Sequence, residues 1–165
     1  MEIREITLAD TEKFIELIQK VENSSKFMLM EAGERQTTLE QQRKNLLHIE
    51  KQENATIFVA EEGEHLVGYL MAVGGTVKRK RHSAYLVIGV LEAHRGKGIG
   101  TALFQTLSEW AHAKGISRLE LTVVTENDGG VALYKKCGFE VEGTKRHSLV
   151  IDGKFYDEYY MSRLL

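Results

Sequence analysis

The chain has 165 residues, of which 42% are hydrophobic and 28% charged, and its formal net charge is −2 at pH 7. This length and composition predict one globular domain over residues 1–165 rather than a disordered, fibrous or multidomain chain. Because the charge is nearly balanced, we expect no bulk attraction to nucleic acid or to an anionic membrane.

The N-terminal third is predicted to contain a short extended start and two helices. Residues 1–5 are charged and lack the apolar core of a signal peptide, so a cytoplasmic location is expected. Apolar residues then recur at helical spacing and predict a helix from Leu8 to Glu22. Thr38–Gln41 has the form of a capping box and predicts a second helix that starts there. The stretch between them, Asn23–Thr37, is predicted to be irregular.

The middle of the chain alternates between strand and turn signals. Residues 56–60 and 66–73 predict two strands, and the polar residues between them predict an antiparallel hairpin. The basic run Lys78–His82 precedes a further strand, Ala84–Leu91. A nucleic-acid site or an import signal is one interpretation of this run. We favour a solvated turn, because the run is isolated and has no interleaved aromatic residues, and we expect no nucleic-acid partner.

The C-terminal half is predicted to hold two further helices and three strands. A helix over 98–113 ends at Gly115, and a strand over 119–124 leads to a short helix that carries Tyr134. The last two strands flank Asp152-Gly153, a strong signal for a tight hairpin. The order β-α-α-β-β-β-α-β-α-β-β therefore predicts an α/β fold, in which about four helices flank a mixed, mostly antiparallel sheet of about seven strands with one right-handed crossover.

The turn before the third helix is rich in glycine and in positive charge. Gly96, Gly98 and Gly100 stand where the chain enters the helix, beside Arg95 and Lys97. The N–H groups at a helix start, together with roughly half a positive charge from the helix dipole, bind phosphate oxygens. Glycine costs about 1 kcal/mol relative to alanine inside a helix. We therefore infer that a phosphate-bearing ligand approaches this backbone closely.

The spacing of the turn decides among phosphate ligands. A P-loop requires glycine where Leu91 stands and Ser or Thr directly after Lys97, so this type of site is excluded. A dinucleotide fingerprint requires glycine or alanine where Thr101 stands, and the chain is too short for two nucleotide-binding halves. A nucleotide oxidoreductase is therefore a remote alternative.

The segment Val90–Leu103 resembles the cofactor motif of the GNAT superfamily of N-acetyltransferases, whose core is Arg/Gln-x-x-Gly-x-Gly/Ala. Arg95, Gly98 and Gly100 occupy these positions. The segment Asn127–Phe139 is similar to the second landmark of that family, and the order of elements agrees over nearly the whole chain. The resemblance implies acetyl-CoA as cosubstrate and a V-shaped opening between the fourth and fifth strands that receives the pantetheine arm. The single cysteine and the six scattered histidines offer no pair at zinc-ligand spacing, so no metal is expected.

The same resemblance implies a set of cofactor-binding residues. Backbone groups of Val90 and Leu91 would bind the pantetheine arm, and Asn127 would hold its other side. The following residues would contact the pyrophosphate: Arg95, Gly96, Lys97, Gly98, Ile99, Gly100 and Thr101. Two positions depart from the family pattern, Glu92 where proline is common and Gly130 where alanine is usual. We expect Glu92 to do little harm and Gly130 to loosen the start of the short helix.

Tyr134 is the candidate general acid for the departing thiolate. A thiol has a pKa of about 8.5 and a tyrosine of about 10, so the proton transfer is feasible where the site favours phenolate. The alternative is that Tyr134 is simply a packed aromatic residue. The candidates for the acceptor site and its general base are Glu31, Glu34 and Glu126, each of which is otherwise a solvated loop charge.

These residues predict an enzyme that transfers acetyl from acetyl-CoA directly to a primary amine of a small molecule or of a protein N-terminus. A ping-pong route through Cys137 is disfavoured, because no histidine is adjacent to it in the sequence. The alternative from another class is a non-catalytic acetyl-CoA-binding sensor or regulatory module. His147 and Tyr156 on the last hairpin are weaker site candidates, and dimerisation through the sheet edges stays open.

Overall fold

The computed structural model describes all residues from 1 to 165, and it contains a seven-stranded sheet with the order β1-β2-β3-β4-β5-β7-β6. The strands are β1 Glu2–Glu5, β2 Ala55–Glu62, β3 His65–Gly74, β4 Ser83–Val90, β5 Arg118–Val124, β6 Glu140–Ile151 and β7 Lys154–Leu164. The helices are α1 Thr11–Ser24, α2 Leu39–Lys51, α3 Ile99–Ala113 and α4 Asp128–Lys136. Neighbouring strands are antiparallel except β4 and β5, which run parallel and are joined through α3. The predicted α/β order is confirmed.

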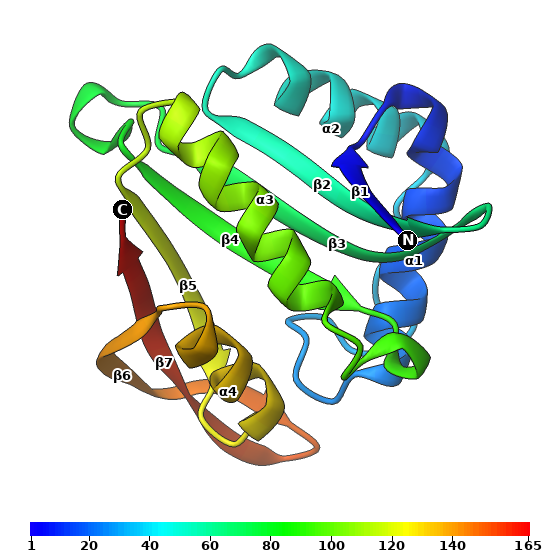
Figure 1. Ribbon diagram of the computed structural model, residues 1–165. Helices are drawn as coiled ribbons and strands as arrows, with labels where there is room; N and C mark the ends of the chain where they lie inside the picture. Colours follow the sequence, from blue (N-terminus) through cyan, green and yellow to red (C-terminus); the bar gives the residue numbers. More distant parts are fainter.

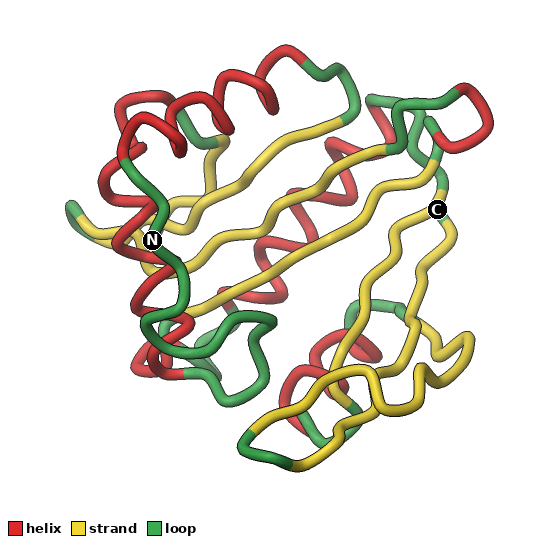
Figure 2. The backbone as a smooth tube through the Cα atoms, turned by 180° about the vertical axis from the view of Figure 1, so that it is seen from behind, coloured by secondary structure: helices red, strands yellow, loops and turns green.

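Helices cover the two faces of the sheet unequally (Figure 1; Figure 2). Leu103 and Leu107 of α3 and Tyr134 of α4 belong to the larger core cluster, together with β5 and β7 side chains. Phe14 and Leu17 of α1 pack with β2 and β3 side chains in a smaller cluster on the other face. The helices α1 and α2 lie against the β1–β4 half of the sheet, so the β5–β7–β6 half carries a helix on one face alone.

The local signals in the sequence are present in the structure. Thr38 caps α2, because its hydroxyl accepts a hydrogen bond from the Gln41 N–H at 3.1 Å and its own N–H donates to the Gln41 side chain at 2.9 Å. Asp152 and Gly153 have φ angles of 50° and 77°, as a type I′ hairpin turn requires. The basic run lies on an exposed turn between β3 and β4. None of the helices combines the length and the apolar character that crossing a membrane requires.

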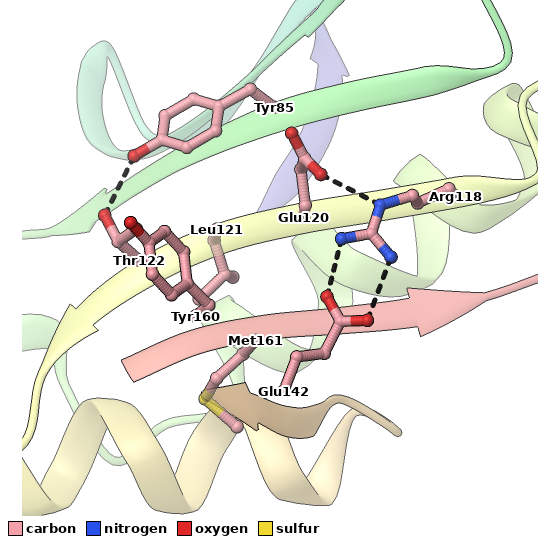
Figure 3. A pocket seen from close by; sticks show the side chains of 8 residues that line it. All are labelled: Tyr85, Arg118, Glu120, Leu121, Thr122, Glu142, Tyr160 and Met161. Atoms are coloured by element: carbon pink, nitrogen blue, oxygen red, sulfur yellow. Dashed lines mark hydrogen bonds and ion pairs between the residues drawn. The ribbon is translucent and has the colours of Figure 1, made fainter. Parts of the chain in front are cut away.

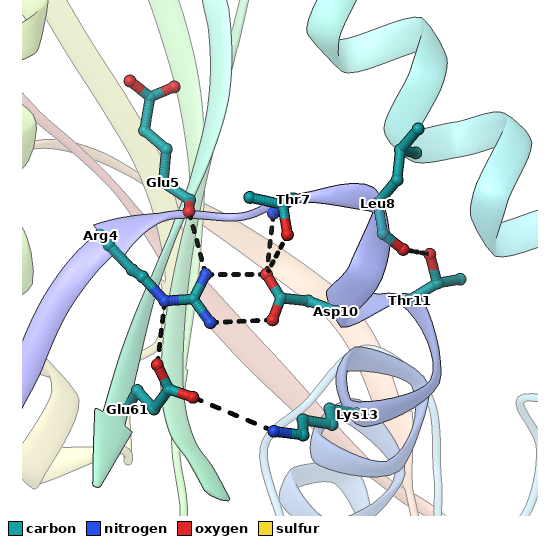
Figure 4. A network of polar contacts seen from close by, with 8 residues as sticks. All are labelled: Arg4, Glu5, Thr7, Leu8, Asp10, Thr11, Lys13 and Glu61. Carbon is teal, nitrogen blue, oxygen red and sulfur yellow. Dashed lines mark hydrogen bonds and ion pairs between the residues drawn. The ribbon is translucent and has the colours of Figure 1, made fainter. Parts of the chain in front are cut away.

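One difference from the sequence prediction lies at the start of α1, which begins at Thr11 after a 3-10 turn over Leu8–Asp10. Arg4 of β1 holds the Asp10 carboxylate with two hydrogen bonds of 2.8 Å and donates a third of 3.0 Å to Glu61 of β2 (Figure 4). Asp10 is only 5% exposed, and its hydrogen bonds with the Arg4 guanidinium lower the pKa of its carboxyl to about 2. The network ties the first strand, the second strand and this turn together.

Candidate active site

The sheet opens between β4 and β5. These strands pair only from Ser83 with Arg118 to Tyr85 with Glu120, and past that point they diverge (Figure 1; Figure 2). The Tyr85 hydroxyl lies 2.9 Å from the Thr122 hydroxyl just beyond the last pair (Figure 3). The V-shaped opening expected between the fourth and fifth strands is therefore present.

Strand register decides which backbone groups of β4 face the opening. Val90 lies opposite Gly68 of β3, and the N–H of Leu91 donates to the carbonyl of Val67 at 2.9 Å. This combination identifies a non-hydrogen-bonded pair, so the N–H and C=O of Val90 point away from β3 into the opening, as do those of Ile88 two residues earlier. The Val90 carbonyl also accepts a hydrogen bond of 3.3 Å from Nε of Arg95, so its N–H is the backbone group left free there, and cofactor binding at Val90 stays a prediction.

Leu91 is placed differently from the expectation. Its N–H is engaged by Val67, and its carbonyl accepts a hydrogen bond from the His94 N–H at 2.9 Å. Both of its backbone groups are therefore used within the protein, and Ile88 takes its place as the second residue whose backbone faces the opening. Sequence reasoning missed Ile88, although the alternation along β4 identifies it once the pairing with β3 is known.

The glycine turn stands at the open end of β4. Gly96 and Gly98 have φ angles of +75° and +83°, and a Cβ at either position would meet no atom within 4 Å. The N–H groups of Ile99, Gly100 and Thr101 belong to the first turn of α3, whose first intrahelical bond runs from Ala102 to Gly98. Arg95 and Lys97 are exposed beside them. The turn thus presents unpaired N–H groups and two cations to open space.

Gly100 corrects the interpretation that all three glycines clear space for a ligand. A Cβ there would lie 2.8 Å from Cδ2 of Leu133 on α4. The close approach of α3 and α4 therefore explains this glycine, while its N–H still points out of the helix start.

The Thr101 hydroxyl lies beside the Cys137 thiol, whose pKa is raised by burial.

Asn127 caps the short helix α4. Its side-chain oxygen accepts a hydrogen bond from the Gly130 N–H at 3.1 Å. A Cβ at Gly130 would lie 2.7 Å from the Asn127 side-chain nitrogen. The expectation that Gly130 loosens the helix start is therefore replaced, because this glycine makes room for the cap. The Asn127 side-chain nitrogen makes no hydrogen bond within the protein and is available to a ligand.

Tyr134 is a packed aromatic residue with an unpaired hydroxyl. It is 9% exposed, and its ring lies edge-on to Phe104 and Phe139 at centroid distances of 5.9 Å and 6.3 Å. The only buried side-chain nitrogen or oxygen without a partner is Nδ1 of His94, so the unpartnered Tyr134 hydroxyl reaches solvent. Burial, and then the neighbouring Tyr69 phenol, raise the pKa of Tyr134. The condition that the site favours phenolate is therefore not met, since burial favours the neutral phenol.

The three predicted acceptor-site carboxylates lie at the surface. Glu31 and Glu34 are exposed and form a turn in which the Glu34 N–H donates to the Glu31 carbonyl at 3.1 Å. Glu126 is also exposed and pairs with Lys154 at 3.2 Å. None of them is buried, so the structure does not gather them into one pocket.

The irregular segment that carries Glu31 and Glu34 nevertheless reaches the second half of the sheet. The Phe27 ring lies 6.0 Å from the Tyr156 ring of β7, edge to face. Lys26 lies over the same Tyr156 ring at 5.5 Å, and Lys154 lies over it at 4.8 Å. Segment 25–38, which connects α1 to α2, therefore also contacts the last hairpin on the other side of the opening. His147 is exposed and stacks on Phe155 at 4.3 Å, on the same hairpin.

Sequence reasoning missed a buried carboxylate. Glu22 is 3% exposed, and Nε of Arg35 donates to its two oxygens at 3.0 Å and 3.1 Å. Tyr69 of β3 lies close by, and burial followed by the charge of Glu22 raises its pKa to about 12. No signal in the sequence distinguished Glu22 from a solvated charge at a helix end, because its partner comes from the irregular segment.

A hollow lies at the closed end of the opening, on the face of β5 and β7 that no helix covers (Figure 3). Its volume is about 290 Å³. Arg118 spans it, with hydrogen bonds of 2.9 Å to Glu120 and 2.6 Å to Glu142, and lowers the pKa of the Glu142 carboxyl. The charges of this hollow are thus paired. Nowhere does the chain gather three His, Cys, Asp or Glu residues that could hold a metal ion.

Comparison with known proteins gives consistent matches. Residues 18–139 match the model of the acetyltransferase (GNAT) family. An L-amino acid N-acetyltransferase of Escherichia coli (strain K12) is 33% identical over 103 residues, which cover 60% of this chain and 62% of that protein. The alignment thus spans less than two thirds of this curated relative.

Two solved structures resemble this chain over almost their full length. An acetyltransferase of the GNAT family from Streptococcus pneumoniae is 30% identical, with a TM-score of 0.95 and coverage of 99% of this chain and 98% of that one. A ribosomal-protein-alanine N-acetyltransferase from Brucella melitensis is 28% identical, with a TM-score of 0.86 and full coverage of both chains.

Proposed function

Because this chain belongs to the acetyltransferase (GNAT) family, we propose that it transfers the acetyl group of acetyl-CoA directly to a primary amine. The observation that carries the proposal is the edge of β4 beyond Tyr85, with which no strand pairs. The backbone of Ile88 and Val90 faces an opening that ends at a glycine turn with unpaired N–H groups. An extended, amide-bearing arm with a pyrophosphate at one end is complementary to this arrangement.

The residues of the site fit such a ligand. Val90 and Ile88 would bind the amides of the pantetheine arm, in the way that a neighbouring strand does. The pyrophosphate would bind to the N–H groups of Ile99–Thr101, where the helix dipole adds roughly half a positive charge. The exposed cations of Arg95 and Lys97 would add to this field, and the side-chain nitrogen of Asn127 would donate to the arm from the other side. Open space above Gly96 and Gly98 supports this placement.

Tyr134 is proposed to assist departure of the thiolate. Burial raises its pKa, so the phenol is neutral at pH 7 and holds its proton. Full transfer of that proton to a thiolate is uphill by more than about 2 kcal/mol, given reference pKa values of about 10 and about 8.5. We therefore infer that Tyr134 acts mainly by donating a hydrogen bond to the sulfur as negative charge develops there.

The acceptor must present a neutral amine. Deprotonation at pH 7 costs about 1 kcal/mol for an α-amine and about 4.6 kcal/mol for a lysine side chain. The names of two similar proteins specify amino acids and a ribosomal-protein alanine, both of which carry α-amines. We propose an α-amine acceptor here too, because it needs little help from a base. Glu31, Glu34 and Glu126 stay candidates for that help at the rim of the opening.

The test is release of CoA from acetyl-CoA in the presence of a panel of primary amines that includes amino acids, short peptides, polyamines and aminoglycosides. Amine-dependent release, with the acetylated product identified by mass spectrometry, is the expected result. Tight binding of acetyl-CoA with no turnover on any amine would contradict the proposal and would favour the sensor module instead.

A further inference from the structure

Arg35 is an arginine that the fold positions but does not satisfy. Its Nε–H is held by both oxygens of Glu22, which is 3% exposed. Its terminal nitrogens, Nη1 and Nη2, make no hydrogen bond within the protein, and its side chain is 34% exposed. A guanidinium anchored at Nε presents the other edge of its planar fork in a fixed direction. Glu22 therefore orients Arg35 and leaves two donor groups for a ligand.

Arg35 is one of five residues that line a hollow with polar walls. Gln19, Glu22, Asn23, Gly33 and Arg35 line it, none of them is hydrophobic, and its volume is about 290 Å³. Arg35 neutralises the charge of Glu22, so the hollow needs no bound cation. The terminal nitrogens of Arg35 are suited to an anion with two oxygens, because the two N–H donors of a guanidinium can bind both oxygens of a carboxylate.

Tyr69 connects this hollow with the opening of the sheet. A Cβ at Gly89 would lie 2.6 Å from Cε1 and 3.1 Å from Cζ of Tyr69, so the ring lies across β4 at this glycine. Gly89 stands between Ile88 and Val90, whose backbone groups face the opening. Val21 of α1 packs against the same glycine, with Cγ1 2.9 Å from that Cβ position. Glu22 directly follows Val21, so the hollow that Glu22 lines is on the α1 side of this part of β4.

We propose that Arg35 binds the carboxylate of the acceptor, and that the acceptors are therefore free α-amino acids rather than peptide N-termini or polyamines. The inference rests on the proposed function. In an α-amino acid the carboxylate stands one carbon from the amine, so Arg35 would fix the amine near the opening. A peptide N-terminus has an amide in place of this carboxylate and offers the fork only one oxygen.

The experiment compares α-amino acids with their carboxamides, which keep the amine and the side chain but lack the carboxylate. The wild type should acetylate the acids with the higher kcat/KM. R35Q also removes the partner of Glu22, so the diagnostic quantity is the ratio of kcat/KM for the acids to kcat/KM for the carboxamides. R35Q should lower this ratio by about 10- to 100-fold, the effect of losing hydrogen bonds to a charged group. R35K keeps the positive charge but lacks the planar fork, so its preference for the acids over the carboxamides should lie between those of the wild type and R35Q. R43Q, at an exposed arginine of α2, is the matched control and should behave as wild type.

A binding measurement separates this proposal from the proposed function. Calorimetric titration of an amino acid into CoA-saturated protein should show binding to the wild type that R35Q weakens, with CoA affinity itself unchanged. That result supports the carboxylate site even if no acetyl transfer occurs, an outcome that would count only against the enzyme. Equal kcat/KM for acids and carboxamides in the wild type, equal loss of both substrates in R35Q, or no amino acid binding would overturn the assignment of Arg35.

Discussion

Replacing Tyr134 with phenylalanine separates packing from chemistry. The ring contacts with Phe104 and Phe139 depend on carbon atoms that phenylalanine retains. The hydroxyl makes no hydrogen bond within the protein, so its removal leaves no buried partner unsatisfied. We therefore expect the free energy of unfolding of Tyr134→Phe to stay within about 0.5 kcal/mol of wild type, as is usual for substitutions that remove no such interaction.

The kinetic effect should be much larger than the effect on stability. General acid assistance contributes about 10²- to 10⁴-fold, and we expect a loss of kcat near the lower limit, because the raised pKa of Tyr134 restricts it to hydrogen bonding. Acetyl-CoA affinity, measured by calorimetry, should hardly change. The raised pKa also implies that activity should not decline through tyrosine ionisation between pH 7 and 9.

Tyr85→Phe is the matched control, because it removes a phenol hydroxyl that does have a protein partner. Its hydroxyl lies 2.9 Å from the Thr122 hydroxyl. Loss of this exposed hydrogen bond should cost about 1 kcal/mol of stability at most, with little change in kcat. An unchanged kcat in Tyr134→Phe, or a loss of acetyl-CoA affinity as large as the loss of kcat, would refute the catalytic role of Tyr134.

Three further predictions concern stability. The pKa of Asp10 is lowered from 3.8 to about 2, so its contribution to the stability of the fold is present above pH 4 and is lost as the pH falls towards 2. Asp10→Asn should therefore lower the free energy of unfolding by about 2 kcal/mol at pH 7. Urea unfolding should show the difference between the variant and the wild type disappearing between pH 4 and pH 2. Gly98→Ala places a side chain at a φ of +83° and should lower the free energy of unfolding by about 1 to 2 kcal/mol; an unchanged melting curve would show that φ does not explain this glycine. Thr38→Ala removes the α2 cap and should lower the free energy of unfolding by about 1 kcal/mol without altering kcat. A loss of kcat in this variant would mean that the cap also positions residues of the site.

Much of the fold was predictable because its signals are local. The capping box at Thr38, the Asp152-Gly153 turn and the helix end at Gly115 each depend on residues within a few positions along the chain. The same holds for the glycine turn of the candidate site, where the helix start and its cations are contiguous in the sequence. Such interactions need no knowledge of the tertiary partner, so a single sequence specifies them.

Other features of the site depend on partners that are distant in sequence. Gly100 is explained by Leu133, which only the packing of α3 against α4 brings near it. Ile88 rather than Leu91 faces the opening, because the register with β3 decides which β4 groups are already paired. A shift of one residue in the pairing of β4 with β3 reverses that choice, and the sequence of β4 alone does not specify this register.

The sequence by itself determined the order of elements, and it predicted phosphate binding at the glycine turn and a candidate role for Tyr134. Only the tertiary structure decided which carboxylate is buried near the opening, since Glu31, Glu34 and Glu126 are exposed and Glu22 is enclosed by Arg35. The physical reason is that burial and charge pairing are properties of a residue's surroundings. The charge partner of Glu22 is Arg35, which belongs to a segment without regular secondary structure, so no periodicity in the sequence reveals the pair.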